Sequence, residues 1–170
     1  AAPGRRAEEV DEVSSVLREL VRITIPAVPV PQPRQRHRIV QPKNGQPFVM
    51  NYTPRKAAVQ DFKATVRLAV QQAGLSAPAD GPVIVDLEFY LPRPKRLMRA
   101  KDPDGPMPHT AKPDRDNLEK AVLDALKGLA WRDDAQVFDG RTRKWYAEKD
   151  GLPRVELVIW EVTAEARRAS

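Results

Sequence analysis

The alternating run Val83–Leu91 constrains the fold of this chain more than any other feature. Its odd-numbered side chains are all large and apolar, whereas the even-numbered ones include Asp86 and Glu88. Successive side chains of a β-strand point to opposite faces of a sheet, so the run predicts a strand that is buried on one face. Such a strand needs other elements packed against its apolar face.

Two amphipathic helices are predicted to supply that cover. The first begins with Thr53 as its N-cap and Pro54 at the first helical position, and it ends at Gly74. The second follows Asp116 and ends near Gly128. Each has an apolar stripe with helical spacing, made of Val59, Phe62, Val66, Ala69, Val70 and Ala73 in the first and of Leu118, Ala121, Val122, Ala125, Leu126 and Leu129 in the second.

The remaining segments complete an α+β fold, a small mixed β-sheet packed with helices. Further strands are predicted over residues 21–28, 136–148 and 153–162, the last two joined by a hairpin turn at Lys149–Gly151. Residues 29–52 and 93–110 are Pro-rich basic loops, with a turn or hairpin tip at Lys43–Gly45. The spacing over residues 7–21 predicts a helix. We therefore expect a helical extension (1–21), one domain (22–163) and a short tail (164–170).

The charge distribution favours an anionic partner. The 170 residues carry a formal net charge of +6, and no acidic residue occurs between Glu19 and Asp61. That interval contains Arg22, Arg34, Arg36, Arg38, Lys43, Arg55 and Lys56. A segment of one sign is typical of a nucleic-acid interface, although a solvated basic loop has the same composition. There are no cysteines and no membrane-length apolar run, so we expect a cytoplasmic protein without a thiolate metal site.

Acidic residues gather on both sides of the second helix in this basic chain. Asp114 and Asp116 precede it, Lys120 follows one turn later, and Asp133 and Asp134 come after it. Such residues commonly serve only as a helix cap and a solvated turn. Two or three carboxylates without cysteine also suit Mg²⁺, with Mn²⁺ as the alternative, and Lys120 could stabilise charge on a phosphate. On this second interpretation, the acidic residues form a cation-binding site within a nucleic-acid-binding surface.

The stretch "KPDRDNLEKAVLDALKGLAWRDDAQVFD" (112–139) resembles the RusA-type Holliday junction resolvases. The upstream Arg-rich segment leading into "YTPRKAAVQDF" is similar to the same family, so the resemblance spans about Ile23 to Val162. It implies that Asp114, Asp116 and Asp134 bind the metal and that Lys120 is essential. It also implies a homodimer without an organic cofactor that cuts four-way DNA junctions by paired nicks, in DNA recombination and repair in a bacterial or phage-infected cell.

We therefore predict a metal-dependent, structure-selective endonuclease in which Asp133 either belongs to a turn or supports the metal ligands without binding the ion. The first candidates for DNA contact are Arg34, Arg36, Arg38, Lys43, Arg55, Lys56, Arg143 and Lys144. Three alternatives remain: a nuclease of other branched DNA, a DNA-binding protein whose acids are only caps and turns, and a basic RNA-associated domain. Phe48 and Tyr52, within the basic loop, are candidates for stacking on bases.

Overall fold

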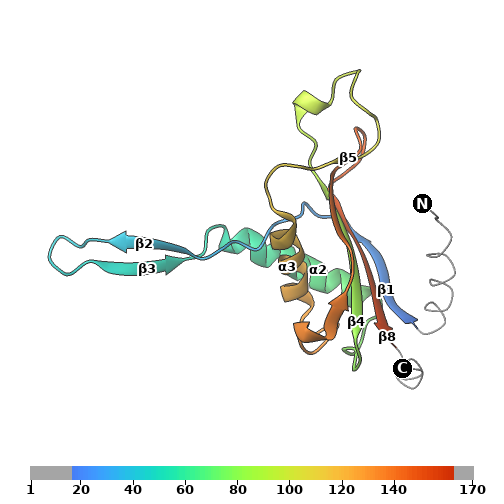
Figure 1. The fold of residues 1–170 in the computed structure, drawn as a ribbon, viewed down its shortest axis with the longest axis horizontal. Coiled ribbons are helices and arrows are strands. Elements are labelled where there is room, and N and C mark those ends of the chain that lie inside the picture. The colour runs from blue at the N-terminus through green and yellow to red at the C-terminus, as the bar shows by residue number, and fades with distance from the viewer. Residues whose placement is uncertain (1–16, 163–170) are drawn as a thin grey trace, which may run out of the picture.

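A computed structural model describes residues 17–162 of the chain. It contains a six-stranded mixed sheet and a separate two-stranded sheet (Figure 1). The elements are β1 (Leu17–Ile25), β2 (Arg36–Val40), β3 (Phe48–Tyr52), α2 (Lys56–Gln72), β4 (Val83–Leu91), η1 (Lys95–Leu97), β5 (Met107–Pro108), α3 (Arg115–Leu126), η2 (Asp134–Gln136), β6 (Val137–Asp139), β7 (Thr142–Tyr146) and β8 (Arg154–Val162). The predicted α+β class is confirmed.

Strand β4 lies at the centre of the large sheet, whose order is β1-β8-β4-β7-β5. It pairs antiparallel with β8 and parallel with β7, and β6 pairs parallel with its first residues. The alternation read from the sequence is confirmed, because the five odd-numbered residues of β4 are all buried. This strand is the scaffold on which the rest of the domain is built.

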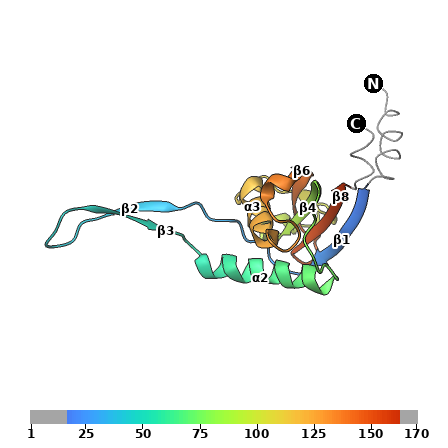
Figure 2. The same ribbon diagram turned by 90° about the horizontal axis from the view of Figure 1, so that it is seen from below.

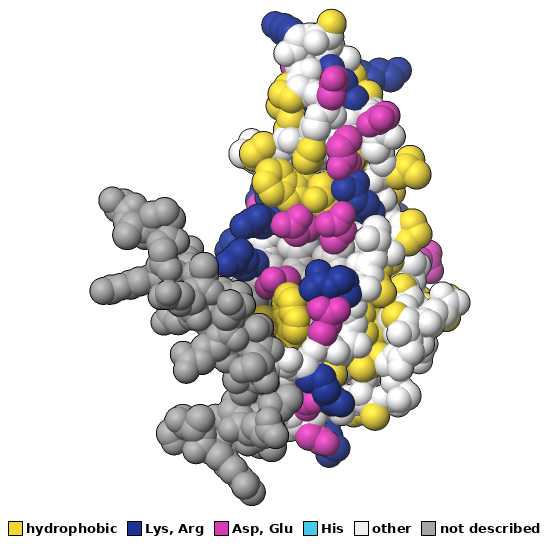
Figure 3. All heavy atoms as spheres, turned by 90° about the vertical axis from the view of Figure 1, so that its right-hand side faces the viewer, with side chains coloured by type: hydrophobic (Ala, Val, Ile, Leu, Met, Phe, Trp, Pro, Cys, Tyr) yellow, Lys and Arg dark blue, Asp and Glu magenta, His cyan; other side chains and the backbone are white. Residues whose placement is uncertain are grey.

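Helices α2 and α3 cover one face of the sheet (Figures 1 and 2). Phe62, Val66 and Val70 of α2 and Leu118 and Val122 of α3 form one buried cluster with the odd-numbered side chains of β4. The other face carries no helix in the described part of the chain, and acidic, basic and apolar side chains are interspersed there (Figure 3). None of the helices within residues 17–162 is long and apolar enough to span a membrane.

The prediction of a helix over residues 7–21 is wrong for the last five residues of that range. Leu17–Val21 belong to strand β1, and residues 7–16 lie outside the described residues. Strand β1 forms a backbone ladder with β8, and Val21 and Ile25 are buried in the core. Long-range pairing of this kind overrides a local helical spacing that only four apolar residues supported.

The hairpin predicted at Lys149–Gly151 is also wrong. Strands β7 and β8 do not pair with each other, because β4 lies between them. The segment that connects β7 to β8 instead passes β4, the strand between them. Arg154 holds this segment, because its guanidinium donates to both carboxylate oxygens of Glu148 at 2.8 and 2.9 Å. This pairing lowers the pKa of Glu148 to about 2.

Residues 29–52 are more ordered than the predicted loop. Strands β2 and β3 pair antiparallel, and Lys43–Gly45 lie at the tip, as expected for a hairpin. Helix α2 begins at Lys56 rather than at Pro54, because Arg55 adopts a left-handed conformation with φ of 55° and occupies the N-cap position. The predicted end at Gly74 is confirmed by its φ of 97°.

Candidate active site and nucleic-acid interface

Asp114 and Asp116 lie at the start of helix α3. The helix begins at Arg115, so Asp114 rather than Asp116 or Asn117 occupies the N-cap position, and Asp116 lies in the first turn. The Asp114 side chain makes no capping hydrogen bond. Its carboxylate is 40% exposed and that of Asp116 is 69% exposed. Both carboxylates are therefore open to an external ligand, and neither is used as a cap.

The two carboxylates contact only cationic side chains. The ammonium of Lys112 donates to both oxygens of Asp114, at 2.7 and 2.6 Å, and this bond lowers the pKa of Asp114. A guanidinium nitrogen of Arg34 lies 3.7 Å from an oxygen of Asp116. The ammonium of Lys112 lies where a metal ion bound to Asp114 would lie. The Lys112 side chain is 84% exposed, so little packing holds it there.

Lys144 holds the loop that leads into the acidic pair. Its ammonium donates to the carbonyl oxygens of Ala111 and Pro113, at 2.6 and 2.7 Å. Burial lowers the pKa of Lys144, and the nearby charge of Asp114 opposes that effect. His109, in the same loop, is buried against Tyr146, and burial lowers its pKa. A β7 side chain thus fixes the position from which α3 begins.

Lys120 lies one helical turn beyond Asp116 on the exposed side of α3. Its side chain is 63% exposed, and its ammonium lies 3.7 Å from the carboxylate of Asp124. Residues four apart on a helix are neighbours on its surface, so Lys120 stands next to Asp116. Lys120 therefore lies on the side of α3 away from its buried residues.

Asp133 and Asp134 lie beyond the other end of α3. With a rise of about 1.5 Å per residue, the helix separates them from Asp114 by about 18 Å. One oxygen of Asp134 accepts a hydrogen bond from the buried indole of Trp131 at 2.9 Å. Asp133 caps η2 by accepting from the amide of Ala135 at 3.0 Å, which confirms its assignment to a turn.

The structure therefore does not bring all three predicted metal ligands together in one protomer. Across residues 17–162, no three His, Asp or Glu side chains are grouped closely enough to hold a metal ion. Mg²⁺, however, is commonly bound through one or two carboxylates, with water and substrate phosphates as the other ligands. The exposed oxygens of Asp114 and Asp116 fit that mode, and the contribution of Asp134 stays a prediction.

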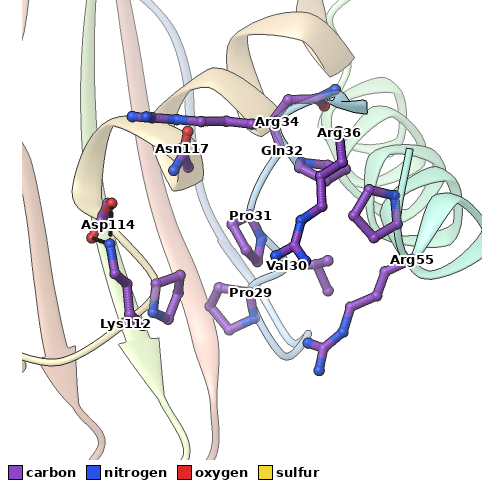
Figure 4. A pocket seen from close by; sticks show the side chains of 13 residues that line it. Pro29, Val30, Pro31, Gln32, Arg34, Arg36, Arg55, Lys112, Asp114 and Asn117 are labelled. Atoms are coloured by element: carbon purple, nitrogen blue, oxygen red, sulfur yellow. Dashed lines mark hydrogen bonds and ion pairs between the residues drawn. The ribbon is translucent and has the colours of Figure 1, made fainter. Parts of the chain in front are cut away.

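A groove of about 680 Å³ opens beside the acidic pair (Figure 4). One wall is the extended segment after β1, which is anchored where the amide of Gln32 donates to the carbonyl of Asn117 at 2.8 Å. The groove is lined by Pro29, Val30, Pro31, Gln32, Pro33, Arg34, Arg36, Pro54, Arg55, Lys112, Pro113, Asp114 and Asn117. Four cationic side chains and one carboxylate thus share a single cleft.

The eight predicted DNA contacts fall into different places. Arg34, Arg36 and Arg55 line the groove, and Lys56 begins the helix at its edge. Arg38 and Lys43 lie on the hairpin. These six exposed cations therefore form one surface that runs from the groove to the hairpin tip.

The two predicted contacts on β7 do not share that surface. Arg143 pairs across the sheet with Glu88, and a nitrogen of its guanidinium lies 3.5 Å from that carboxylate. Lys144 pairs with the buried Phe89 and holds the loop before α3. Neighbouring residues of a strand face opposite sides of a sheet, so Arg143 and Lys144 lie on opposite faces.

Lys112 and Asn117 are site residues that the sequence reasoning missed. Lys112 bonds to Asp114, and Asn117 lines the groove and anchors its wall. Both belong to the stretch "KPDRDN", so their place in that motif was the available signal. Their roles depend on the loop before α3 and on the segment after β1, which lie far apart in the sequence.

Comparisons with known proteins identify the family of the chain. The family model "Endodeoxyribonuclease RusA" matches residues 26–159. The chain belongs to the RusA family. "Crossover junction endodeoxyribonuclease RusA" of Escherichia coli (strain K12) is 30% identical over 140 residues, which cover 82% of this chain and 97% of that protein. "Uncharacterized protein YqaN" of Bacillus subtilis (strain 168) is 36% identical over 151 residues, 86% of this chain and 99% of that protein.

A phage relative is similar over a shorter region. "Crossover junction endodeoxyribonuclease rusA" of Enterobacteria phage 82 is 48% identical over 60 residues, which cover 35% of this chain and 48% of that protein. The resemblance inferred from the sequence is thus confirmed. The RusA family match includes the groove, the acidic pair and the β2–β3 hairpin.

Proposed function

We propose that this chain is a structure-selective endonuclease that resolves four-way DNA junctions by paired nicks. The observation that carries the proposal is the groove that Arg34, Arg36, Arg55 and Lys112 line together with the open carboxylate of Asp114. Cationic walls attract the phosphate backbone, while exposed carboxylates in the same cleft repel it unless a cation lies between them. Membership of the RusA family supports the same reaction class.

Asp114 and Asp116 would hold Mg²⁺, with Mn²⁺ as the alternative. A bound divalent ion would polarise the scissile phosphate and lower the pKa of a water molecule. Binding of the ion at Asp114 would displace the Lys112 ammonium, which would then be available to the DNA backbone. Lys120, beside Asp116, stabilises the negative charge on the phosphoryl oxygens. Lys144 holds the loop so that Asp114 keeps its position.

Asp134 is proposed to act in a second copy of the chain. Two nicks on strands of opposite polarity need two equivalent sites, and a two-fold homodimer provides them. Within one protomer α3 keeps Asp134 about 18 Å from Asp114, judged from the helical rise. Trp131 engages one oxygen of Asp134 and leaves the other available to a partner's site. On this proposal, each active site takes Asp114 and Asp116 from one chain and Asp134 from the other.

The reaction is tested with Asp116→Asn on a synthetic four-way junction in the presence of Mg²⁺. We expect junction binding to be retained, nicking to fall by at least about 100-fold, and Mn²⁺ binding measured by calorimetry to be lost. Asp104→Asn is the matched control, because Asp104 is 96% exposed in a distant loop. Undiminished cutting by Asp116→Asn contradicts the metal role. Equal cutting of linear duplex and of flaps contradicts the junction preference.

The shared site is tested by mixing two inactive chains. A dimer of one Asp114→Asn chain and one Asp134→Asn chain, isolated through two different tags, contains one intact shared site. It should nick one strand of each junction, whereas either variant alone should nick neither. Without rescue in the mixed dimer, Asp134 does not act across the subunits.

A further inference from the structure

The β2–β3 hairpin projects from the domain as an arm (Figures 1 and 2). Its strands form their own two-stranded sheet, and five of its large apolar side chains are exposed, namely Ile39, Phe48, Val49, Met50 and Tyr52. Two-stranded hairpins without a packed face are marginally stable in water. An arm with this many uncovered apolar side chains is suited to a contact outside its own domain.

The strand register divides the arm into two unlike faces. Arg36 pairs with Tyr52, Arg38 with Met50, and Val40 with Phe48. These six side chains share one face, because directly opposite residues of a β-ladder point to the same side. We call it the cationic-aromatic face. The other face carries the Ile39–Val49 pair and the His37–Asn51 pair, whose side chains are hydrogen-bonded at 2.6 Å.

The partner of the cationic-aromatic face must be anionic. No acidic residue occurs between Glu19 and Asp61, so the arm carries no negative charge of its own. Arginine beside exposed aromatic and thioether groups is a surface that combines phosphate contact with stacking on bases. In a linear duplex the faces of the bases are covered by their neighbours, whereas in an open junction the base pairs at the branch point lack a stacking neighbour on one side.

We propose that the cationic-aromatic face of the arm binds unstacked bases at the branch point of DNA and thereby gives the chain its preference for branched over linear DNA. The inference rests on the proposed function, because it assigns the branch point to the arm and the scissile bond to the groove. Arg36 belongs to both, since it lines the groove and begins β2.

The length of the arm limits where the cut can fall. From Arg36 to Val40 a strand extends about 13 Å, at about 3.3 Å per residue. Along one strand of a duplex the spacing is about 3.4 Å per nucleotide, so this length corresponds to about four nucleotides. A base held against Phe48 or Tyr52 therefore lies within a few nucleotides of a phosphate in the groove.

The test compares two double variants that truncate exposed apolar side chains on opposite faces of the arm. Phe48→Ala with Tyr52→Ala changes the cationic-aromatic face, at side chains that are 52% and 40% exposed. Ile39→Ala with Val49→Ala is the matched control, at side chains that are 73% and 62% exposed. Binding to a four-way junction and to linear duplex of the same sequence is measured in EDTA, with 2-aminopurine placed at the branch point as a reporter of stacking.

The first double variant should bind the junction about 10- to 100-fold more weakly, change duplex binding less than about threefold, and lose the 2-aminopurine response. The control should bind both DNAs like the wild type. Equal loss on junction and duplex would mean that the arm enters a duplex groove, and it would overturn the proposal. Unchanged junction binding by the first variant would also overturn the proposal. A smaller assembly of that variant in light scattering would overturn it too, because it would assign the arm to contact with a second copy of the chain.

Failure of the arm proposal is distinguishable from failure of the proposed function. A wild-type chain that nicks junctions in Mg²⁺, while both double variants bind alike in EDTA, would overturn only the role of the arm. A chain that prefers junctions through Phe48 and Tyr52 but never nicks them would overturn the nuclease reaction instead.

Discussion

The two ends of helix α3 carry similar acidic pairs in different surroundings. At the first end, within residues 17–162, Asp114 and Asp116 pair with the exposed cations of Lys112 and Arg34. At the other end, Asp134 accepts from the indole of Trp131 and Asp133 caps η2. The comparison shows that a carboxylate paired only with exposed lysine or arginine side chains stays open to a ligand, whereas one that caps a backbone amide, as Asp133 does, is committed to the fold.

The helix dipole explains why the second pair needs those partners. The N-terminus of a helix carries partial positive charge and favours Asp114 and Asp116, whereas the C-terminus carries partial negative charge and disfavours nearby acids. Lys127, the C-cap of α3, offsets that effect, and its ammonium lies 3.0 Å from Asp133. The hydrogen bond from the amide of Ala135 and the bond from the ammonium of Lys127 both lower the pKa of Asp133.

The largest expected difference between the two ends is catalytic. Asp114→Asn should reduce nicking by at least about 100-fold, because the variant removes an anionic ligand. Asp133→Asn should leave nicking within about twofold, because an asparagine oxygen can still cap η2. Both rates are measured on the same junction in Mg²⁺. Loss of cutting in Asp133→Asn would contradict its assignment to a turn.

The next effect concerns stability. Trp131→Phe should lower the free energy of unfolding by about 2–3 kcal/mol, because it leaves a small cavity and removes the indole donor that Asp134 uses. Trp160→Phe is the control, because Trp160 is only partly buried, on the sheet face without helices. Urea denaturation checks both variants. Equal losses would show that Trp131 does not fix this end of the helix.

A smaller effect is expected for the network around Arg154. The lowered pKa of Glu148, about 2, means that its carboxylate binds fewer protons in the folded than in the unfolded chain. Its stabilising contribution is therefore present above the ordinary carboxyl pKa and is lost as the pH falls toward 2. Glu148→Gln should cost about 1–2 kcal/mol at pH 7 and much less near pH 2, by urea denaturation at both pH values. A loss independent of pH would contradict the ionic role.

The smallest effect is expected at Lys112. Its bond lowers the pKa of Asp114, so Lys112→Met should return that pKa toward its ordinary value. Asp114 then begins to bind a proton at a higher pH. Because no ammonium has to leave Asp114, Mn²⁺ binding should be slightly tighter at pH 7, and it should begin to fall at a higher pH than in the wild type. Calorimetry between pH 4 and pH 7 checks this, with Lys101→Met as a control from an exposed distant loop. An unchanged acid profile would contradict the coupling.

The sequence by itself determined the elements whose pattern is local. The alternation of Val83–Leu91, the apolar stripes of α2 and α3 and the turn at Lys43–Gly45 were predictable, because a strand or helix repeats its side-chain directions within a few residues. The acidic pair before α3, the exposed Lys120 and the one-sign basic segment were likewise visible in the chain.

Only the tertiary structure decided which of these elements meet. The placement of β4 between β7 and β8, the pairing of β1 with β8, and the division of Arg143 and Lys144 between two faces all follow from backbone pairing between distant segments. The length of α3 sets Asp134 apart from Asp114, which the spacing of residues along the chain could not reveal. Local periodicity fixes what a segment is, whereas long-range hydrogen bonding and burial fix where it lies.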